Sequence, residues 1–239
     1  MNTGSSACKI DWKKVKGAIM VEHGVKLPAD ITSEKLLELC HADRPDRIYP
    51  IFPFLEYASN GGDPQVNATG YGASEYNGLN ALTDTFTLKS FDEVLNAQLL
   101  KCANKGWDVY FWNQDNTLIG FNDGTDVLAG ISMSSVYPTV TRFPTSGAKS
   151  TMTVSFAHED AEESLLNFDY VQLDFNPKNF LMGLVDVVLE KTEAENAYKI
   201  IEKIGGYDRT EEFGSLIADS AAEVMNNTTS ASYADGVIT

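Results

Sequence analysis

Basic residues are scarce in this chain of 239 residues. Eighteen lysines and arginines stand against 34 aspartates and glutamates, which gives a formal net charge of −16 at pH 7. Because such a chain repels phosphate, the sequence disfavours a protein that grips nucleic acid. Two explanations of the acidity stay open: solubility at high concentration, and a surface that nucleic acid passes without sticking to it.

Cysteine is also rare. Only Cys8, Cys40 and Cys102 occur, their number is odd, and no CxxC pair is present. A disulfide framework and a structural zinc site are therefore poorly supported, and reduced thiols in a protein made in a cytosol fit best. We interpret Cys102 as a small core residue and not as a nucleophile, because free cysteine is usually buried.

Long hydrophobic runs are missing. No stretch approaches 18 apolar residues, so no membrane span is expected. The first 17 residues lack the apolar run of a signal peptide. The composition is otherwise that of a globular protein, with 43% hydrophobic and 10% aromatic residues, which argues against wholesale disorder.

Catalytic signatures are absent as well. The three histidines, His23, His41 and His158, form no HExxH, HxH or His–Cys cluster, and neither GxSxG nor GxxxxGK[ST] occurs. His158 begins "HEDAEE", which we interpret as a solvated helix start in preference to a metal site. We predict no catalytic, cofactor-binding or metal-binding residues, no cofactor and no enzymatic activity, although triads assemble in space and not in sequence.

The most informative stretch is "GWDVYFWNQDNTLIGFNDGTDVLAGI", residues 106–131. "NQDN" at 113–116 and Asp123-Gly124 are turn signals, because Asn, Asp and Gly adopt the backbone angles of tight turns. We therefore predict an antiparallel meander whose second and third strands are residues 117–121 and 127–131. The Asp and Asn residues are better explained as turn formers than as a calcium site, because the order of an EF-hand loop is missing.

The first strand of this meander is rich in aromatic residues. Alternation places Trp107, Val109 and Phe111 on one face, and it places Asp108, Tyr110 and Trp112 on the other. We interpret the aromatic residues as cross-strand pairs and core anchors.

A helix precedes the meander in "TFTLKSFDEVLNAQLLKCANKG". Thr85 to Leu88 alternate as a short strand, Ser90-x-x-Glu93 forms a capping box, and Gly106 ends the helix. The predicted flanking helix covers residues 90–105. Its apolar stripe is formed by Phe91, Val94, Leu95, Leu99 and Cys102.

The N-terminal segment is less regular. "ITSEKLLELCHA" predicts a short helix that Thr32 or Ser33 caps. "RPDRIYPIFPFLEY" contains three prolines, which exclude a helix or a central strand and favour an extended edge. Residues 58–82 are rich in Gly and Asn and predict a long loop or an irregular hairpin. This segment is either an arm that reaches a neighbour or a mobile surface loop.

Three more strands are predicted at 149–157, 168–175 and 181–192, with a short helix at 158–168. A second capping box at Thr192-x-x-Glu195 predicts a helix whose face is Ala197, Ile200, Ile201 and Ile204, followed by helical residues 215–225 and a polar tail. We predict an α+β fold: an antiparallel β-sandwich or barrel with one flanking amphipathic helix and a helical C-terminal extension. The predicted domains are residues 1–83, 84–191 and 192–239.

Residues 84–190 resemble virion structural proteins of tailed bacteriophages, in particular those of phages that infect Bacteroides-type gut bacteria, including the crAss-like group. The resemblance lies in "TFTLKSFDEVLNAQLLKCANKGWDVYFWNQDNTLIGFNDGTDVLAGI", "TVTRFPTSGAKSTMTVSFAHED" and "YVQLDFNP". It implies a tail-tube or connector-ring subunit: an antiparallel sandwich or barrel, one flanking helix, and arms that grip neighbours. The large C-terminal piece departs from a minimal tube protein.

The implied function is a non-enzymatic virion protein that self-assembles into a ring or tube of a phage tail or head–tail connector. Its partners would be copies of itself and other virion proteins, and DNA would pass through the lumen without specific binding. The protein would be made in the host cytoplasm and reside in the virion. One alternative is a capsid-decorating protein, and another is a hydrolase whose acidic catalytic residues form no recognisable motif. A third is a carbohydrate- or host-surface-binding β-domain that stacks sugars on Trp107, Trp112, Tyr110 and Tyr71.

Overall fold

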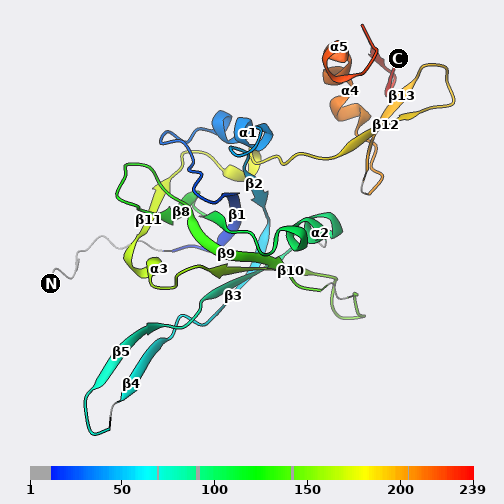
Figure 1. Ribbon diagram of the computed structural model, residues 1–239. Helices are drawn as coiled ribbons and strands as arrows, with labels where there is room; N and C mark the ends of the chain where they lie inside the picture. The colour runs from blue at the N-terminus through cyan, green and yellow to red at the C-terminus, as the bar shows by residue number, and fades with distance from the viewer. Residues whose placement is uncertain (1–11, 69, 90–91, 141–142, 204) are drawn as a thin grey trace. The chain divides into compact units, whose positions relative to one another are not determined.

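The structure is a computed structural model, and it divides the chain into two units (Figure 1). The larger unit is Met1–Gly183 and the smaller unit is Leu184–Thr239. The division therefore falls inside the predicted domain 84–191, and the predicted segment 1–83 contributes strands to the main sheet. The described residues are 12–68, 70–89, 92–140, 143–203 and 205–239.

A nine-stranded antiparallel sheet organises the larger unit. One path through this sheet runs β11-β8-β7-β9-β10-β6-β3, and β1 connects β7 to β2. The strands are β1 (Val15–Glu22), β2 (Tyr49–Ile51), β3 (Phe54–Asn60), β6 (Thr83–Leu88), β7 (Trp107–Asn113), β8 (Thr117–Phe121), β9 (Ile131–Pro138), β10 (Met152–His158) and β11 (Phe168–Gln172).

The sheet branches at β7. One edge of β7 pairs with β1 along its whole length. On the other edge, residues 111–112 pair with β8 and residues 107–109 pair with β9. The predicted hairpin of β7 and β8 is therefore confirmed, but the third strand of the meander is wrong. It begins at Ile131 instead of Val127 and pairs with β7, because β8 covers only half of that edge.

The two ends of the sheet are neighbours in the sequence. β2 and β3 are separated only by Phe52 and Pro53, yet β2 pairs with β1 and β3 pairs with β6. The sheet therefore curls, but in the described residues it does not form a closed barrel. The α+β class with antiparallel strands is confirmed, and the architecture is compatible with a sandwich.

One hydrophobic core lies against the face of β7 that carries Trp107, Val109 and Phe111, as the alternation predicted. Phe86 of β6 is stacked on Phe54 of β3, with ring centroids 4.4 Å apart. Both rings are 2% exposed, which shows how far the core extends from β7 towards the other end of the sheet. Other members of this core are Ala18, Met20, Ile51, Leu88, Leu99, Ile119, Phe121, Ile131, Met133, Val136, Met152, Val154 and Phe156.

Helix α2 (Glu93–Cys102) packs against this core through the buried Leu99. The flanking helix is thus confirmed, but it is shorter than the predicted range 90–105. Its N-cap is Asp92, whose carboxylate accepts the backbone N–H groups two and three residues further on at 2.9 and 3.0 Å. Ser90 and Phe91 of the predicted cap and stripe lie outside the described residues.

A second core lies against the opposite face of β7, around Tyr110 and Trp112. Helix α1 (Ser33–His41) covers it with Leu36 and Cys40, and Thr32 caps this helix by accepting the N–H of Lys35. A 3-10 turn, η1 (Pro177–Asn179), and its flanking residues Leu173 and Leu181 complete the cover. Because both faces of β7 are covered, all seven of its residues are buried.

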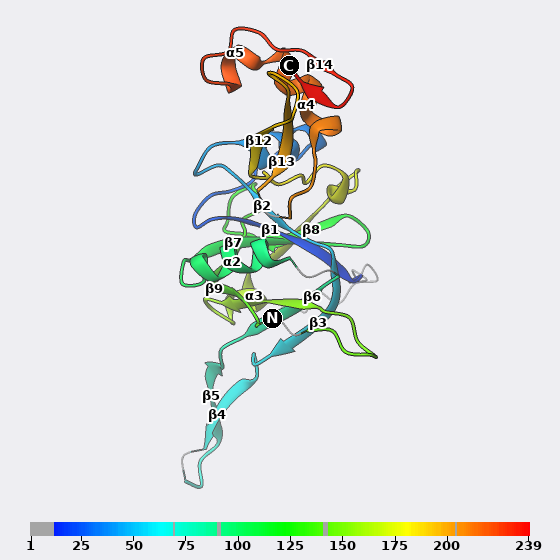
Figure 2. The same ribbon diagram turned by 90° about the vertical axis from the view of Figure 1, so that its right-hand side faces the viewer.

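The Gly-rich segment forms a separate two-stranded hairpin of β4 (Pro64–Ala68) and β5 (Ser74–Leu79). Figures 1 and 2 show it extending from the end of β3, away from the body of the larger unit. Of the two alternatives for residues 58–82, a long loop and an irregular hairpin, the structure has the hairpin, with a register shift between Pro64 and Val66, while residues 58–60 belong to β3.

The smaller unit is a four-stranded sheet with two helices. Its strand order is β12-β13-β15-β14, and the elements are β12 (Val187–Lys191), β13 (Tyr198–Glu202), α4 (Thr210–Asp219), α5 (Ala221–Val224), β14 (Tyr233–Ala234) and β15 (Val237–Ile238). The predicted helix after Thr192 is wrong, because its apolar residues form β13, and its last residue, Ile204, lies outside the described residues. The helical C-terminal extension is therefore not confirmed; helices cover 210–219 and 221–224, and the polar tail ends in a short hairpin.

Candidate functional site

The aromatic cluster of β7 is part of the two cores. Trp107, Tyr110 and Trp112 are 5%, 0% and 2% exposed. The hydroxyl of Tyr110 donates to the carbonyl oxygen of Leu128 and accepts the N–H of Leu27, both at 3.2 Å. Burial raises the pKa of Tyr110 to about 12. These three rings cannot stack on a sugar from solvent, so only Tyr71 of the four proposed sugar-binding residues is accessible.

The Asp and Asn side chains beside this cluster form turns, as predicted. The Oδ1 atom of Asn113 accepts the N–H groups of Asp115 and Thr117 at 2.9 and 3.0 Å. Asn116 has φ 60°, the left-handed conformation that Asn tolerates in a turn. Across the described part of the chain, no group of three or more His, Cys, Asp or Glu side chains is arranged to hold a metal ion.

His158 does not lie on a solvated helix start, and that prediction is wrong. It is the last residue of β10 and is 9% exposed. Its Nε2 atom lies 2.8 Å from Oδ2 of Asp84 and its Nδ1 atom lies 3.2 Å from Oγ of Ser164. The hydroxyl of Tyr57 donates to the other oxygen of Asp84 at 2.7 Å. The helix start itself is the short α3 (Glu163–Leu166), five residues further on.

This network links four elements through one buried carboxylate. Burial alone would raise the pKa of Asp84, but the hydrogen bonds from His158 and Tyr57 outweigh it and hold that pKa below its ordinary value. Asp84, His158 and Ser164 stand in the order of a nucleophilic triad. The same contacts satisfy two buried polar side chains and hold α3 against the sheet, which is sufficient reason for them. The sequence hides the network, because Asp84 and His158 are 74 residues apart.

Asp108, near the start of β7, forms a second polar cluster. It is 7% exposed, and its Oδ2 atom accepts the N–H of Gly24 at 2.7 Å. Its Oδ1 atom lies 3.0 Å from Nδ1 of His23 and accepts the hydroxyl of Ser132 at 3.2 Å. These bonds fix the turn after β1 onto β7 and β9, so Asp108 has a structural explanation.

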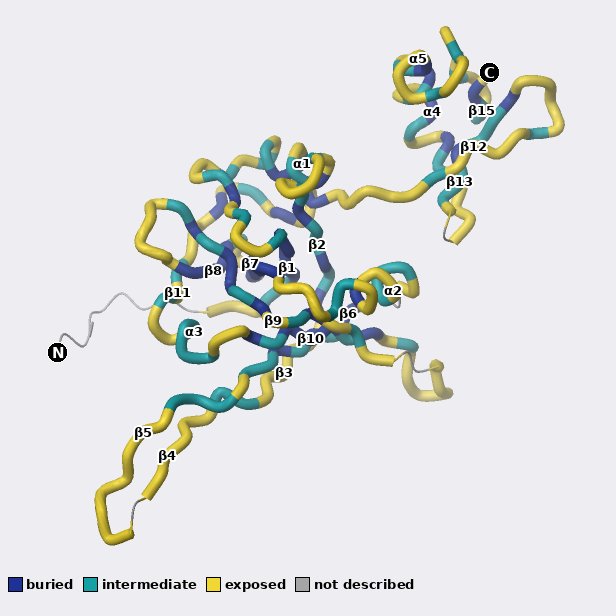
Figure 3. Tube along the Cα trace, in the orientation of Figure 1, coloured by how far each residue is buried: buried dark blue, intermediate teal, exposed yellow. Residues whose placement is uncertain are grey.

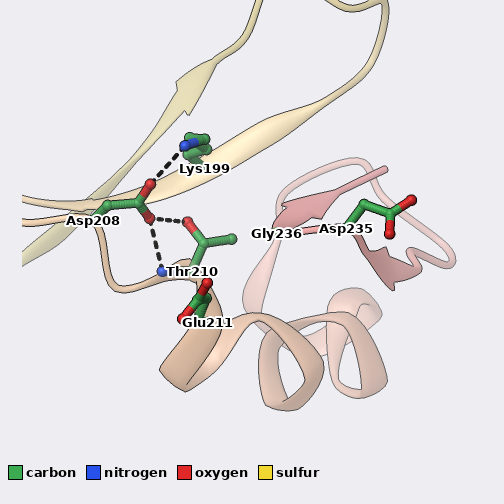
Figure 4. Close-up of a pocket in the computed structure, with 6 residues that line it drawn as sticks. All are labelled: Lys199, Asp208, Thr210, Glu211, Asp235 and Gly236. Atoms are coloured by element: carbon green, nitrogen blue, oxygen red, sulfur yellow. Dashed lines mark hydrogen bonds and ion pairs between the residues drawn. The ribbon is translucent and has the colours of Figure 1, made fainter.

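The smaller unit has a shallow pocket of about 320 Å³, shown in Figure 4. Asp208 accepts hydrogen bonds from Nζ of Lys199 at 2.7 Å and from the backbone N–H of Thr210 at 3.0 Å. The bond from Lys199 is the main reason that the pKa of Asp208 is lowered to about 2. Because Asp208 already accepts hydrogen bonds from Lys199 and Thr210, we interpret the pocket as part of the turn that leads into α4. Its lining is Lys199, Asp208, Thr210, Glu211, Asp235 and Gly236.

Large apolar side chains on the surface of the larger unit lie mainly on its projecting and edge elements. Figure 3 shows most of the β4–β5 hairpin coloured as exposed. The β4–β5 hairpin carries Val66, Tyr71 and Tyr76, and its described residues are exposed except at the end of β5. In the loop between β9 and β10, Val140 and Phe143 are 89% and 90% exposed. Around α3 and β11 lie Leu165, Leu166, Phe168, Tyr170 and Val171. The ring of Trp12 packs edge-on against two of them, Phe168 and Tyr170.

These surfaces are the candidate functional site, because the polar clusters around the buried Asp84, Asp108 and Asn113 are explained by the hydrogen bonds that hold the fold together. No helix in the described ranges has both the length and the apolar character needed to cross a membrane. Comparisons of the chain with protein-family models, with curated proteins and with solved structures found no match.

Proposed function

We propose that this protein is a non-enzymatic structural subunit that assembles with copies of itself into a ring or tube, in the virion of a tailed phage. Its place there would be the tail or the head–tail connector. The proposal rests first on the resemblance of residues 84–190. It rests also on two cores that the chain fills with its own side chains, and on exposed apolar residues at the rim of the larger unit, which is the β4–β5 hairpin, the loop between β9 and β10, α3 and β11.

The β4–β5 hairpin is the observation that carries the proposal. Its two strands pair only with each other in the described residues, and its apolar side chains face solvent. A two-stranded hairpin is marginally stable by itself in water. Tyr71 and Val66, which are 112% and 56% exposed, gain a dry environment only when another molecule covers them. A neighbouring subunit is the partner that a ring supplies.

The charge of the chain agrees with a DNA passage. A net charge of −16 repels phosphate at short range, so DNA would move through a ring of such subunits without adhering. In this proposal the acidic surface has a mechanical role: it keeps the DNA from binding, and no residue reads its sequence.

The test compares the native chain with two variants by light scattering and negative-stain microscopy over a range of concentrations. In the hairpin variant, Val66→Ser and Tyr71→Ser remove the exposed apolar groups. In the control variant, Val140→Ser removes an apolar group that is 89% exposed from the loop between β9 and β10. We expect rings from the native chain and the control, and monomers from the hairpin variant. A native chain that stays monomeric at high concentration, with no rings in the micrographs, would contradict the proposal.

A further inference from the structure

The larger unit has two apolar faces with opposite charge, and Figure 1 shows their helices, α2 and α3, on opposite sides of this unit. We infer that the face at α3 and β11 binds the face at α2 of a second copy, head to tail. This inference rests on the proposed function, because it names a second contact that a ring of these subunits would need besides that of the β4–β5 hairpin.

The β11 face is formed by Leu165 and Leu166 of α3 with Phe168 and Tyr170 of β11. Leu165 and Leu166 are 73% and 79% exposed, and the two rings are 44% and 41% exposed. β11 pairs only with β8 in the described sheet, so its outer edge has no strand beside it. Such an edge with exposed apolar side chains is a template for association.

The surroundings of the β11 face are predominantly acidic; the lysines that adjoin it in the sequence are Lys13 and Lys14, which follow Trp12, whose ring packs against Phe168 and Tyr170. No lysine or arginine occurs from residue 150 to residue 177, whereas Glu159, Asp160, Glu162, Glu163, Asp169 and Asp174 all fall in that range. The adjoining hairpin and strands, residues 48–88, contain no lysine or arginine either. These two segments meet, because the hydroxyl of Tyr76 in β5 donates to Glu162 at 2.7 Å. The excess of carboxylates around α3 favours a partner that brings positive charge.

The α2 face has the complementary chemistry. Leu100 is 68% exposed and is followed by Lys101 and Lys105, both exposed. In the described residues neither lysine forms an ion pair with a carboxylate, so their charges are available to a partner. The C-terminal end of a helix also favours cations, through the helix dipole.

Arg44 extends the positive charge of the α2 face. Its Nε atom donates to the hydroxyl of Tyr49 at 3.0 Å, the Tyr49 ring packs edge-on against Trp107, and Nε1 of Trp107 donates to the carbonyl oxygen of Cys102 at 3.4 Å. This chain of contacts places Arg44 next to the end of α2. Part of its charge is matched by Glu22 at 3.5 Å, but the guanidinium side chain remains 59% exposed.

The two faces therefore match in both respects that an interface needs. The β11 face exposes two leucines and the α2 face exposes one, Leu100, and the excess charges beside them are opposite. Because the faces differ, the contact is heterologous, and repetition of one rotation generates a ring or a helical tube. A two-fold dimer would instead place acidic groups against acidic groups.

Charge reversal tests the contact. The acidic variant reverses acidic residues of the β11 face and carries Glu159→Lys and Glu163→Lys. The basic variant reverses basic residues of the α2 face and carries Lys101→Glu and Lys105→Glu. For neither glutamate does a side-chain hydrogen bond or ion pair appear among the described contacts, so the exchanges leave the fold intact. We expect each variant to raise the apparent dissociation constant of self-association by about tenfold or more. We expect the equimolar mixture, and the chain with all four exchanges, to recover association, because each contact is again between opposite charges.

The control variant, Glu34→Lys and Glu38→Lys on α1, changes the net charge as much as the acidic variant and should associate like the native chain. Sedimentation velocity at low and moderate salt measures all of them, since salt screens the contact. If the native chain forms rings but neither reversal weakens them, or if the mixture does not recover, the contact is wrong while self-assembly stands. If the native chain does not associate at all, the proposed function fails and this contact fails with it.

Discussion

The contact between Gly17 and Trp112 offers a sharp test of the core. Gly17 in β1 lies directly opposite Trp112 in β7. A Cβ atom added at Gly17 would lie 2.1 Å from Cη2 of Trp112 and 2.8 Å from Cβ of Phe52. Side-chain atoms do not approach so closely, and Trp112 is 2% exposed, so its ring has little room to move. Gly17→Ala must therefore disturb the second core.

We expect Gly17→Ala to lower the free energy of unfolding by about 1–3 kcal/mol, which is the usual cost of extra volume in a packed core. Without the ring, alanine in a strand would instead be more stable than glycine by about 0.5–1 kcal/mol. The two cases differ in sign, so the direction of the change by itself tests the contact. Truncation in Trp112→Ala should cost about 3–5 kcal/mol, because it empties a buried volume.

Urea unfolding, followed by circular dichroism at a concentration too low for assembly, measures these free energies. Gly147→Ala is the matched control: a Cβ atom at Gly147 meets nothing within 4 Å, so we expect no loss of stability. In the Trp112→Ala background, Gly17→Ala should cost less than it does alone, with Phe52 as the remaining obstacle. If Gly17→Ala is as stable as the native chain, Trp112 does not cover Gly17 and its assignment to the core is refuted.

Three further changes test other parts of the fold. The pKa of Asp84 lies below 3.8 in the folded chain, so its stabilising contribution is complete above pH 3.8 and is lost as the pH falls through the folded pKa. Asp84→Asn should therefore lower the free energy of unfolding near neutral pH and weaken its dependence on acid pH in urea titrations. If the dependence on acid pH stays unchanged, the network of Asp84 with His158 is contradicted. Burial raises the pKa of the Cys40 thiol to about 11, so a thiol reagent near pH 8 should label Cys40 only as fast as the chain opens, and rapid labelling would refute its burial. In Gly214→Ala, the new Cβ atom would lie 2.5 Å from the ring of Tyr233. This clash should outweigh the gain in helix propensity of about 1 kcal/mol, so amide exchange in α4 should become faster. Slower exchange would show that the ring can move aside.

Local signals predicted the elements that local chemistry determines. The hairpin of β7 and β8 has its turn where Asn113 accepts two backbone N–H groups, and these bonds need only neighbouring residues. The alternation of β7 was also correct, because its two faces enter two different cores. The flanking helix was found from its apolar stripe, although its cap turned out to be Asp92.

Elements that depend on distant partners were missed. "VKGAIMVE" of β1 is apolar on both faces, so it lacks the period of a half-buried strand, yet it pairs along the whole of β7. The segment around Ile200 and Ile201 has helical spacing but forms β13, because β12 and β15 supply its hydrogen bonds. His158 was misplaced for the same reason: its partner Asp84 is remote in sequence. The charged faces of α2 and β11 are surface arrangements that no local period reveals.

The burial of β7 on both faces also separates stability from assembly. A side chain such as Tyr110, which is 0% exposed, can influence a neighbouring subunit only by unfolding its own chain. A side chain such as Tyr71, which is fully exposed, contributes little to the fold, since surface changes away from special backbone positions shift stability by about 0.5 kcal/mol or less. Core variants should therefore lower the unfolding free energy and leave the association of the remaining folded subunits unchanged. Rim variants, which change exposed apolar residues such as Tyr71, should weaken association and leave the unfolding free energy unchanged. A rim variant that weakens association at undiminished stability locates the contact, and a core variant with that behaviour would mean that β7 is not enclosed as described.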